Sequence, residues 1–387
     1  MSAFSTTIKN MNTMKLGENM NKEYSWSHDI EELIVQFQFQ LVRGGGDSLK
    51  DKYQIILKKI FGNEYVNKEY VDVIYRLIGY TRDIVNGKGE YTLSYMLISE
   101  FHKFSESDDC PLNHKYKIRA MLLTLLESFV KINSNEHAYG SWKDLKYFCN
   151  YHIEEKDRNE ENLKKLNDPL FNKAISLMCG QIQSDENAPV KTLAAKWIPR
   201  EKSSKFGWIT NELAIKYYNK WITPNLSDVQ YKIAKRKCLT HFRQLVSKIN
   251  KNINTPQINQ CNSDWSHIDF DKNVTSITLR KQSKAFQGID KEGNPRKDVE
   301  NNEDRIKCIQ NYKEYVERCN VGKSIAKGKR VSMYDFVKDA LNVKSDDDKI
   351  MLNAQWDDNG KENGKLENFI AMVDTSESME SNNNESL

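Results

Sequence analysis

The chain has 387 residues and a net charge of only +4, with 39% hydrophobic and 29% charged residues. Its length allows one large or two ordinary domains with a sizeable core, and the many charges predict solvated helix faces. No signal peptide is evident, and the longest apolar run, residues 120–126, is too short to span a bilayer, so we expect an intracellular, cytoplasmic protein with no membrane partner.

Helical spacing of apolar residues dominates the first 350 positions. Ile30, Leu33, Ile34 and Phe37 follow a helical period, and glycines 44–46 end it. Similar patterns predict helices over residues 49–60, 71–78, 90–104, 115–132, 170–182, 209–221, 229–249, 304–319 and 333–341. The early helices begin about 20 residues apart, so a pair occupies roughly 40, the length of a HEAT-type repeat. We expect a mainly α fold, an α-solenoid of HEAT-like helical pairs that can close into a ring.

Composition divides the chain into four predicted segments. We expect a flexible N-terminal tail over residues 1–21, a helical module over 22–343, an acidic linker over 344–365 and a short final segment over 366–387. Within the module, residues 252–303 are rich in Asn, Asp and Gly, which predicts a long irregular connection. From residue 344 onward there are 4 Lys against 11 Asp and Glu, a local charge of −7 that would attract a cation.

Residues 191–251 form the basic middle of the chain. They hold 14 Lys and Arg against 3 Asp and Glu, a local charge of +11. Phosphates attract such a surface, and aromatic side chains interleaved with the charges can stack on unpaired bases. The candidate nucleic-acid-binding residues are Lys196, Trp197, Arg200, Lys202, Lys205, Lys232, Lys235, Arg236, Lys237 and Arg243. The alternative is a solvated helix with its tryptophans in the core.

An apolar run over residues 369–373 predicts a buried strand. Asp374, Ser376 and Ser378 follow it and offer one carboxylate and two hydroxyls at alternating positions. Mg²⁺ prefers such oxygen ligands, and α/β sheets place ligand sites at the carboxyl ends of strands. The pattern predicts an incomplete Mg²⁺ site, and we expect weak or no binding because three oxygens from one turn leave the ion mostly to water. The alternative is a serine-rich tail after an apolar patch.

The sequence VDTSESM, residues 373–379, resembles the metal-ion-dependent adhesion motif that opens a von Willebrand factor A domain. Glu377 stands where members of that family commonly have Gly. The family's metal site also uses a Thr and an Asp from later loops. The resemblance therefore implies that this chain is truncated just after the motif begins, and we expect a split or interrupted reading frame.

Six further segments, in order, resemble a family of largely uncharacterised proteins in which a helical module precedes a von Willebrand A domain. They are RDIVNGKGE (82–90), YGSWKDL (139–145), AAKWIPREKS (194–203), CNSDWSHIDFDK (261–272), KAF (284–286) and AQWDD (354–358). That family is distantly similar to the TROVE module of the Ro RNA-binding ribonucleoproteins. The resemblance covers roughly residues 22–379 and implies RNA binding, without carrying over any residue-level contact.

Two of these segments also have local interpretations. The glycines of NGKGE, residues 86–90, would suit a phosphate cradle, but no Walker spacing is present. A turn between two helices is favoured, with Arg82 and Asp83 capping or bridging them. In YGSWKDL we expect Ser141 to cap a helix and Asp144 to complete a capping-box-like arrangement.

Seven scattered cysteines without C-x-x-C pairs predict reduced thiols rather than disulfides. Cys149 with His152, and Cys238 with His241, have a spacing that would suit one shared zinc ion. Because the two pairs lie on separate predicted helices far apart in sequence, two ordinary helical faces are the favoured interpretation.

Our first hypothesis is a non-enzymatic RNA-binding or ribonucleoprotein-like scaffold that uses a basic helical face. The alternative is a protein–protein interaction module whose von Willebrand A metal site is incomplete, with a partner that binds the C-terminal segment or supplies a separately encoded half. A metal-dependent nuclease is disfavoured because acidic ligands do not cluster in the helical region. Abundant Asn and Lys with few Pro are typical of AT-rich genomes, large DNA viruses among them, for which the location would be the host cytoplasm.

Overall fold

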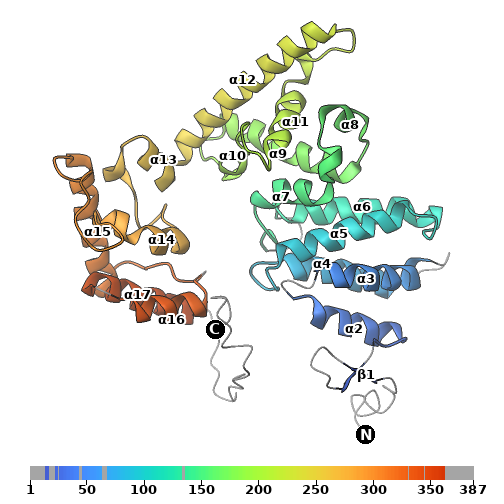
Figure 1. The fold of residues 1–387 in the computed structure, drawn as a ribbon, viewed down its shortest axis with the longest axis horizontal. Coiled ribbons are helices and arrows are strands. Elements are labelled where there is room, and N and C mark those ends of the chain that lie inside the picture. Colours follow the sequence, from blue (N-terminus) through green and yellow to red (C-terminus); the bar gives the residue numbers. More distant parts are fainter. Residues whose placement is uncertain are drawn as a thin grey trace. The chain divides into compact units, whose positions relative to one another are not determined.

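The computed structural model describes residues 14–16, 22–24, 26–42, 46–62, 68–132, 136–329, 331–343 and 345–361 (Figure 1). Over these residues the chain is mainly α-helical, as the apolar spacing predicts. They fall into two compact units: unit 1 ends at Ile249 and unit 2 begins at Asn250. Within the described ranges, no helix combines the length and the apolar character needed to cross a membrane.

Unit 1 is built around helix α5 (Tyr91–Glu106). This helix packs against α3 (Gly46–Phe61), α4 (Lys68–Arg82), α6 (Leu112–Ser128) and α7 (Lys143–His152). Twelve of its sixteen residues are buried, which is typical of a helix with neighbours on every side. The other elements are β1 (Met14–Leu16), β2 (Lys22–Tyr24), α2 (Ile30–Gln40), η1 (Glu155–Asp157), α8 (Glu160–Lys165), α9 (Pro169–Asn187), α10 (Ala194–Trp197), α11 (Gly207–Tyr217), η2 (Asn219–Trp221) and α12 (Asp228–Ile253), which runs past the boundary between the units.

The two short strands form an antiparallel hairpin in which Met14 is opposite Tyr24. Strand β1 lies within residues 1–21, the segment that composition predicts as a flexible tail, so regular structure begins earlier there than expected. Helix α2 follows at Ile30 and is capped by Asp29, whose carboxylate accepts hydrogen bonds from the first-turn amides of Glu31 and Glu32.

The segments RDIVNGKGE and YGSWKDL meet through a buried ion pair. Asp144 is 1% exposed and accepts hydrogen bonds from Nε and Nη2 of Arg82, at 2.6 and 2.7 Å. It also accepts one from the hydroxyl of Tyr95 at 2.5 Å and one from the amide of Ser141 at 2.7 Å. A side chain on Gly140 would collide with this pair, since its Cβ would lie 2.6 Å from the Asp144 carboxylate. Both segments are therefore architectural.

The predicted details of these two segments need one correction. Helix α7 starts at Lys143, one residue later than expected, and Trp142 rather than Ser141 occupies the N-cap position. The Asp144 carboxylate still reaches back to the amide of Ser141, as in a capping box. The turn after Arg82 is confirmed, because the amides of Lys88, Gly89 and Glu90 donate to backbone carbonyls and are not free to bind a phosphate.

Unit 2 has its own aromatic core. Phe270 lies 5.0 Å from Phe286, 5.3 Å from Tyr312 and 5.6 Å from Tyr315, measured between ring centroids. The elements of unit 2 are α13 (Pro256–Cys261), η3 (Trp265–His267), α14 (Ser276–Gln287), α15 (Glu303–Asn320), α16 (Met333–Leu341) and α17 (Asp346–Gly360). The prediction of a long irregular connection over residues 252–303 is wrong for much of that range, because α13, η3 and α14 lie in it. Helix α14 supplies Leu279 and Phe286 to the core, and Trp265 of η3 packs against it.

The prediction of an acidic linker over residues 344–365 is also wrong for the part that the structure describes. Residues 346–360 form helix α17, which is capped by the hydroxyl of Ser345 and has three aspartates in its first turn. Negative charge at a helix N-terminus is favourable, so the acidic run stabilises a helix start. Met351, Gln355 and Asp358 are buried on one face of α17, which packs against α15.

Hydrogen bonds join helix α17 to the segment before α16. They involve the AQWDD segment and Asn359, the residue that follows it. Asp358 accepts one from the amide of Gly328 at 2.8 Å, and Gln355 donates one to the carbonyl of Lys327 at 2.9 Å. Asn359 donates to the carbonyls of Gly328 and Val331, both at 3.2 Å. The AQWDD segment therefore also has an architectural role.

Candidate nucleic-acid interface

Three lysines and four aromatic rings gather on one part of unit 1. We call this set the lysine–aromatic cluster: Lys143, Lys146, Lys205, Tyr91, Tyr147, Trp197 and Phe206. The start of α5 supplies Tyr91, and α7 supplies Lys143, Lys146 and Tyr147. Lys143 lies about one helical turn before Lys146 and Tyr147, so the three side chains share one face of α7. Helix α10 supplies Trp197, and the chain before α11 supplies Lys205 and Phe206.

The ammonium groups lie over ring faces at cation–π distance. Lys143 is 5.1 Å from the Tyr91 ring and 4.9 Å from the Tyr147 ring, measured from Nζ to the centroid. Lys146 is 5.1 Å from Trp197 and 5.3 Å from Phe206. Tyr147 and Phe206 are themselves in edge contact, with centroids 4.9 Å apart. Such contacts hold cations near an exposed aromatic surface without neutralising them.

The positive charge of this cluster is not compensated within the described residues. No described carboxylate lies within salt-bridge distance of Lys143, Lys146 or Lys205, nor of the neighbouring Lys196. Burial, reinforced by the nearby charge of Lys143, lowers the pKa of Lys146 below its ordinary value. Burial also lowers the pKa of Lys196. The free protein thus holds charged ammonium groups at a cost, and a bound anion would relieve it.

Helix α12, which the sequence predicts as the basic helix, has part of its positive charge paired with carboxylates. In α12, Lys235 forms an ion pair with Glu160 at 2.6 Å, and Arg243 forms one with Glu201 at 3.0 Å. The hydrogen bond from Lys235 is the main reason that the pKa of Glu160 falls to about 2. Lys237 lies over the Trp221 ring, 4.4 Å from its centroid. The two ion pairs therefore compensate the charges of Lys235 and Arg243, which the sequence analysis treated as open.

The remaining predicted residues stay exposed. Lys232 and Arg236 project from α12, and Arg200 and Lys202 lie in the chain between α10 and α11. None of the four has a described carboxylate within salt-bridge distance. The structure therefore brings Lys196, Trp197 and Lys205 of the predicted set beside α7. Sequence reasoning missed Lys143, Lys146 and Tyr147, although the three-residue spacing of the two lysines would place both on one helix face.

The predicted Mg²⁺ ligands Asp374, Ser376 and Ser378, and the strand before them, lie outside the described residues. Among the described residues, the group of side chains suited to a metal ion is His102, His152 and Asp168. Cys238 and His241 are not in that group, so His152 does not join them in the shared zinc site that the two Cys–His spacings would allow. The thiol of Cys238 instead approaches the carbonyl of Tyr218.

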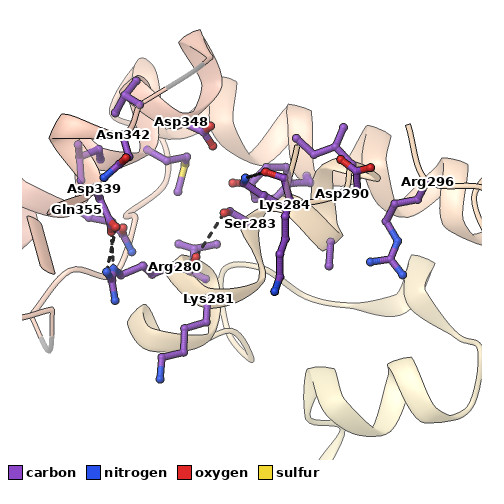
Figure 2. A pocket seen from close by; sticks show the side chains of 18 residues that line it. Arg280, Lys281, Ser283, Lys284, Asp290, Arg296, Asp339, Asn342, Asp348 and Gln355 are labelled. Atoms are coloured by element: carbon purple, nitrogen blue, oxygen red, sulfur yellow. Dashed lines mark hydrogen bonds and ion pairs between the residues drawn. The ribbon is translucent and has the colours of Figure 1, made fainter. Parts of the chain in front are cut away.

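Unit 2 contains a cavity with a volume of about 530 Å³ between α14, α16 and α17 (Figure 2). Its lining includes the cations Arg280, Lys284 and Arg296. Arg280 is paired with both Asp335 and Asp339, and Arg296 is paired with Asp298. Lys281 and Lys291 also line the cavity, and like Lys284 they have no described carboxylate within salt-bridge distance, but the carboxylates of Asp290, Asp339 and Asp348 share the lining. The cavity therefore presents charges of both signs to a phosphate, whereas no described carboxylate pairs with the lysines of the lysine–aromatic cluster.

In comparisons with known proteins, no family model, curated protein or solved structure matches this chain.

Proposed function

We propose that this protein is a non-enzymatic scaffold that binds single-stranded RNA on the lysine–aromatic cluster of unit 1. The observation that carries the proposal is the convergence of Lys143, Lys146 and Lys205 on aromatic rings, with no described carboxylate within salt-bridge distance. Phosphates neutralise such charges, and counterions released from the nucleic acid drive the association. Rings beside the charges add a stacking surface for unpaired bases.

The aromatic side chains favour a single strand over a duplex. Tyr91 is 41% exposed, and Tyr147 and Phe206 are half-buried, so parts of these rings are open to solvent. The bases of a duplex are stacked on one another and cannot cover a protein ring, whereas those of a single strand can. The six segments that occur in the order of a TROVE-related helical module support RNA rather than DNA as the ligand.

The scaffold part of the proposal concerns the helices beneath the cluster. We infer that the helices of unit 1 form HEAT-like pairs, because α2 packs on α3, α4 on α5 and α5 on α6, each a near neighbour in sequence. The ion pair between Arg82 and Asp144 fixes the start of α7 against α4. It thereby fixes the direction in which Lys143 and Lys146 project.

The test is the affinity for a fluorescently labelled oligouridine, measured by anisotropy across a salt series. Wild-type protein should bind with an affinity that falls steeply as salt rises. The triple variant Lys143→Gln, Lys146→Gln, Lys205→Gln should lose at least about tenfold in affinity. Its salt dependence should flatten by about two in the logarithmic slope, since a single strand gives about 0.7 per phosphate contact.

A matched control separates the cluster from general positive charge. The triple variant Lys232→Gln, Arg236→Gln, Lys248→Gln removes the same number of positive charges, all of them exposed on α12, and should retain most of the affinity and slope. A duplex of the same length should bind more weakly than the single strand. Equal losses in the two triple variants, or no binding by wild-type protein at low salt, would show that the cluster is not an RNA site.

A further inference from the structure

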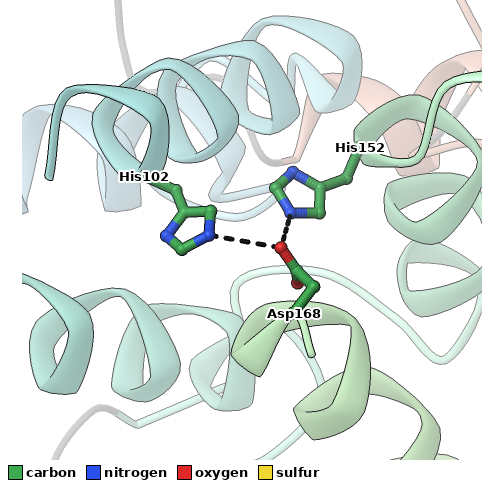
Figure 3. Close-up of side chains that lie close together, drawn as sticks. All are labelled: His102, His152 and Asp168. Carbon is green, nitrogen blue, oxygen red and sulfur yellow. Dashed lines mark hydrogen bonds and ion pairs between the residues drawn. The ribbon is translucent and has the colours of Figure 1, made fainter. Parts of the chain in front are cut away.

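Three side chains from separate parts of unit 1 converge at a second site, which shares no residue with the lysine–aromatic cluster. His102 lies on α5, His152 is the last residue of α7, and Asp168 is the N-cap residue of α9 (Figure 3). Both imidazoles approach the same carboxylate oxygen. The distances from Asp168 Oδ2 are 3.2 Å to His102 Nε2 and 3.0 Å to His152 Nε2.

We propose that His102, His152 and Asp168 bind a zinc ion. Two imidazole nitrogens and one carboxylate oxygen are a common zinc ligand set, with a water molecule in the fourth position. Zinc–ligand distances of about 2.0–2.1 Å place neighbouring tetrahedral ligands about 3.3 Å apart. The observed separations of 3.0 and 3.2 Å are close to that edge length. The three ligand atoms all lie within 4.8 Å of one another, so small side-chain movements would centre them on an ion.

The atoms around the three ligands also suit a metal ion. The other oxygen of Asp168, Oδ1, accepts a hydrogen bond from the amide of Phe171 at 2.7 Å, which fixes the carboxylate and leaves Oδ2 as a single ligand atom. Nδ1 of His152 lies 2.9 Å from the hydroxyl of Ser99. A hydrogen bond from the outer nitrogen of a ligating histidine orients the ring toward the metal.

His102 provides an independent observation. It is 8% exposed, yet its Nδ1 atom is buried without a hydrogen-bond partner. Among the described residues, the His102 ring makes its polar contact through Nε2 to the shared oxygen of Asp168, on which the second histidine converges as well. A metal ion accounts for that convergence, because it needs both rings to point at one place.

Zinc at this position would join three helices of unit 1. The ion would replace two hydrogen bonds by three coordinate bonds among α5, α7 and α9. Because folding brings these ligands together from distant parts of the sequence, binding free energy adds to the stability of the folded unit. The site is independent of the proposed RNA binding, so either can fail without the other.

The experiment is a titration of untagged, chelator-treated full-length protein with Zn²⁺ against a chromophoric competitor. The background carries Cys261→Ser, which removes the one exposed thiol among the described residues. One Zn²⁺ should bind per chain, and the thermal midpoint should rise with Zn²⁺. Cobalt in place of zinc should give the intense visible absorption of a four-coordinate ion.

Two ligand variants and one control decide the outcome. Asp168→Asn retains a helix cap and an oxygen toward Phe171. His102→Gln removes a ring whose Nδ1 has no hydrogen-bond partner. Each variant should weaken the zinc affinity by at least about tenfold. His267→Gln is the matched control, because His267 is an exposed histidine paired with Asp264 but with no third ligand. Circular dichroism confirms folding of each variant. Unchanged affinity in both ligand variants, or no zinc binding by the parent, would overturn the assignment.

Discussion

Replacing Asp144 by asparagine should destabilise unit 1 by about 3–5 kcal/mol, because it leaves the guanidinium of Arg82 buried without its charge partner. The side chains of the pair are 6% and 2% exposed, so water cannot take the place of the lost carboxylate. The same change weakens the hydrogen bonds from Tyr95 and Ser141. Urea unfolding gives the total loss. Hydrogen–deuterium exchange should locate it at α4, α5 and the start of α7.

The control for this prediction lies on α4 itself. Asp72 and Arg76 form an ion pair of the same residue types at 2.8 Å, but their side chains are 58% and 77% exposed. Asp72→Asn should change the stability by less than about 1 kcal/mol, as is typical of surface pairs. The double variant Arg82→Met, Asp144→Asn should recover part of the loss, since no buried charge is left without a partner. A loss in Asp144→Asn no larger than in Asp72→Asn would contradict the structural role of the buried pair.

The second large effect is expected for Gly328→Ala in unit 2. An added Cβ would lie 1.7 Å from the carbonyl oxygen of Gln355 and 2.8 Å from its Cα, so the backbones of the two segments would have to separate. Separation would break the hydrogen bond from the Gly328 amide and leave the buried carboxylate of Asp358 without it. We expect a loss of about 3 kcal/mol or more, from overpacking together with an unsatisfied buried group.

Gly360→Ala is the matched control for this change. Gly360 is the last residue of α17, and its Cβ would meet no atom within 4 Å. That variant should stay within about 1 kcal/mol of wild type, and alanine's higher helix propensity favours the stable side. Exchange at α17 should accelerate in Gly328→Ala and remain as in wild type in Gly360→Ala. Unaltered exchange at α17 in Gly328→Ala would refute the close backbone contact.

Most of the longer helices were predictable because apolar residues recur in them at helical spacing. Composition misled where a helix is mostly polar. Helix α17 carries Asp, Asn and Gly, which indicate a linker, but its buried face needs only Met351, Gln355 and Asp358. Two of these three are polar residues that form tertiary hydrogen bonds, so hydrophobic spacing alone could not reveal the face. The same reason applies to residues 252–303, where aromatic core residues are separated by polar turns.

The candidate site was predictable only in part, because charge counting along the sequence ignores partners that folding brings in. Lys235 meets Glu160, 75 positions earlier, and Arg243 meets Glu201, 42 positions earlier. Neither acid lies near its partner in the sequence. Conversely, Lys143 lies in the segment YGSWKDL, whose capping pattern suggested an architectural role, and Lys146 follows directly after it. That role is correct for Asp144, yet the outer face of the same helix turn carries the uncompensated lysines.

The central claim is that single-stranded RNA occupies the lysine–aromatic cluster. Ultraviolet cross-linking of a thiouridine-containing oligouridine, followed by mass spectrometry of the attached peptides, tests it most directly. Adducts are expected on Tyr91, on residues 143–147 and on residues 196–206, and they should be lost in the Lys143, Lys146, Lys205 triple variant. Adducts confined to unit 2 or to the exposed face of α12, with the cluster unmodified, would contradict it.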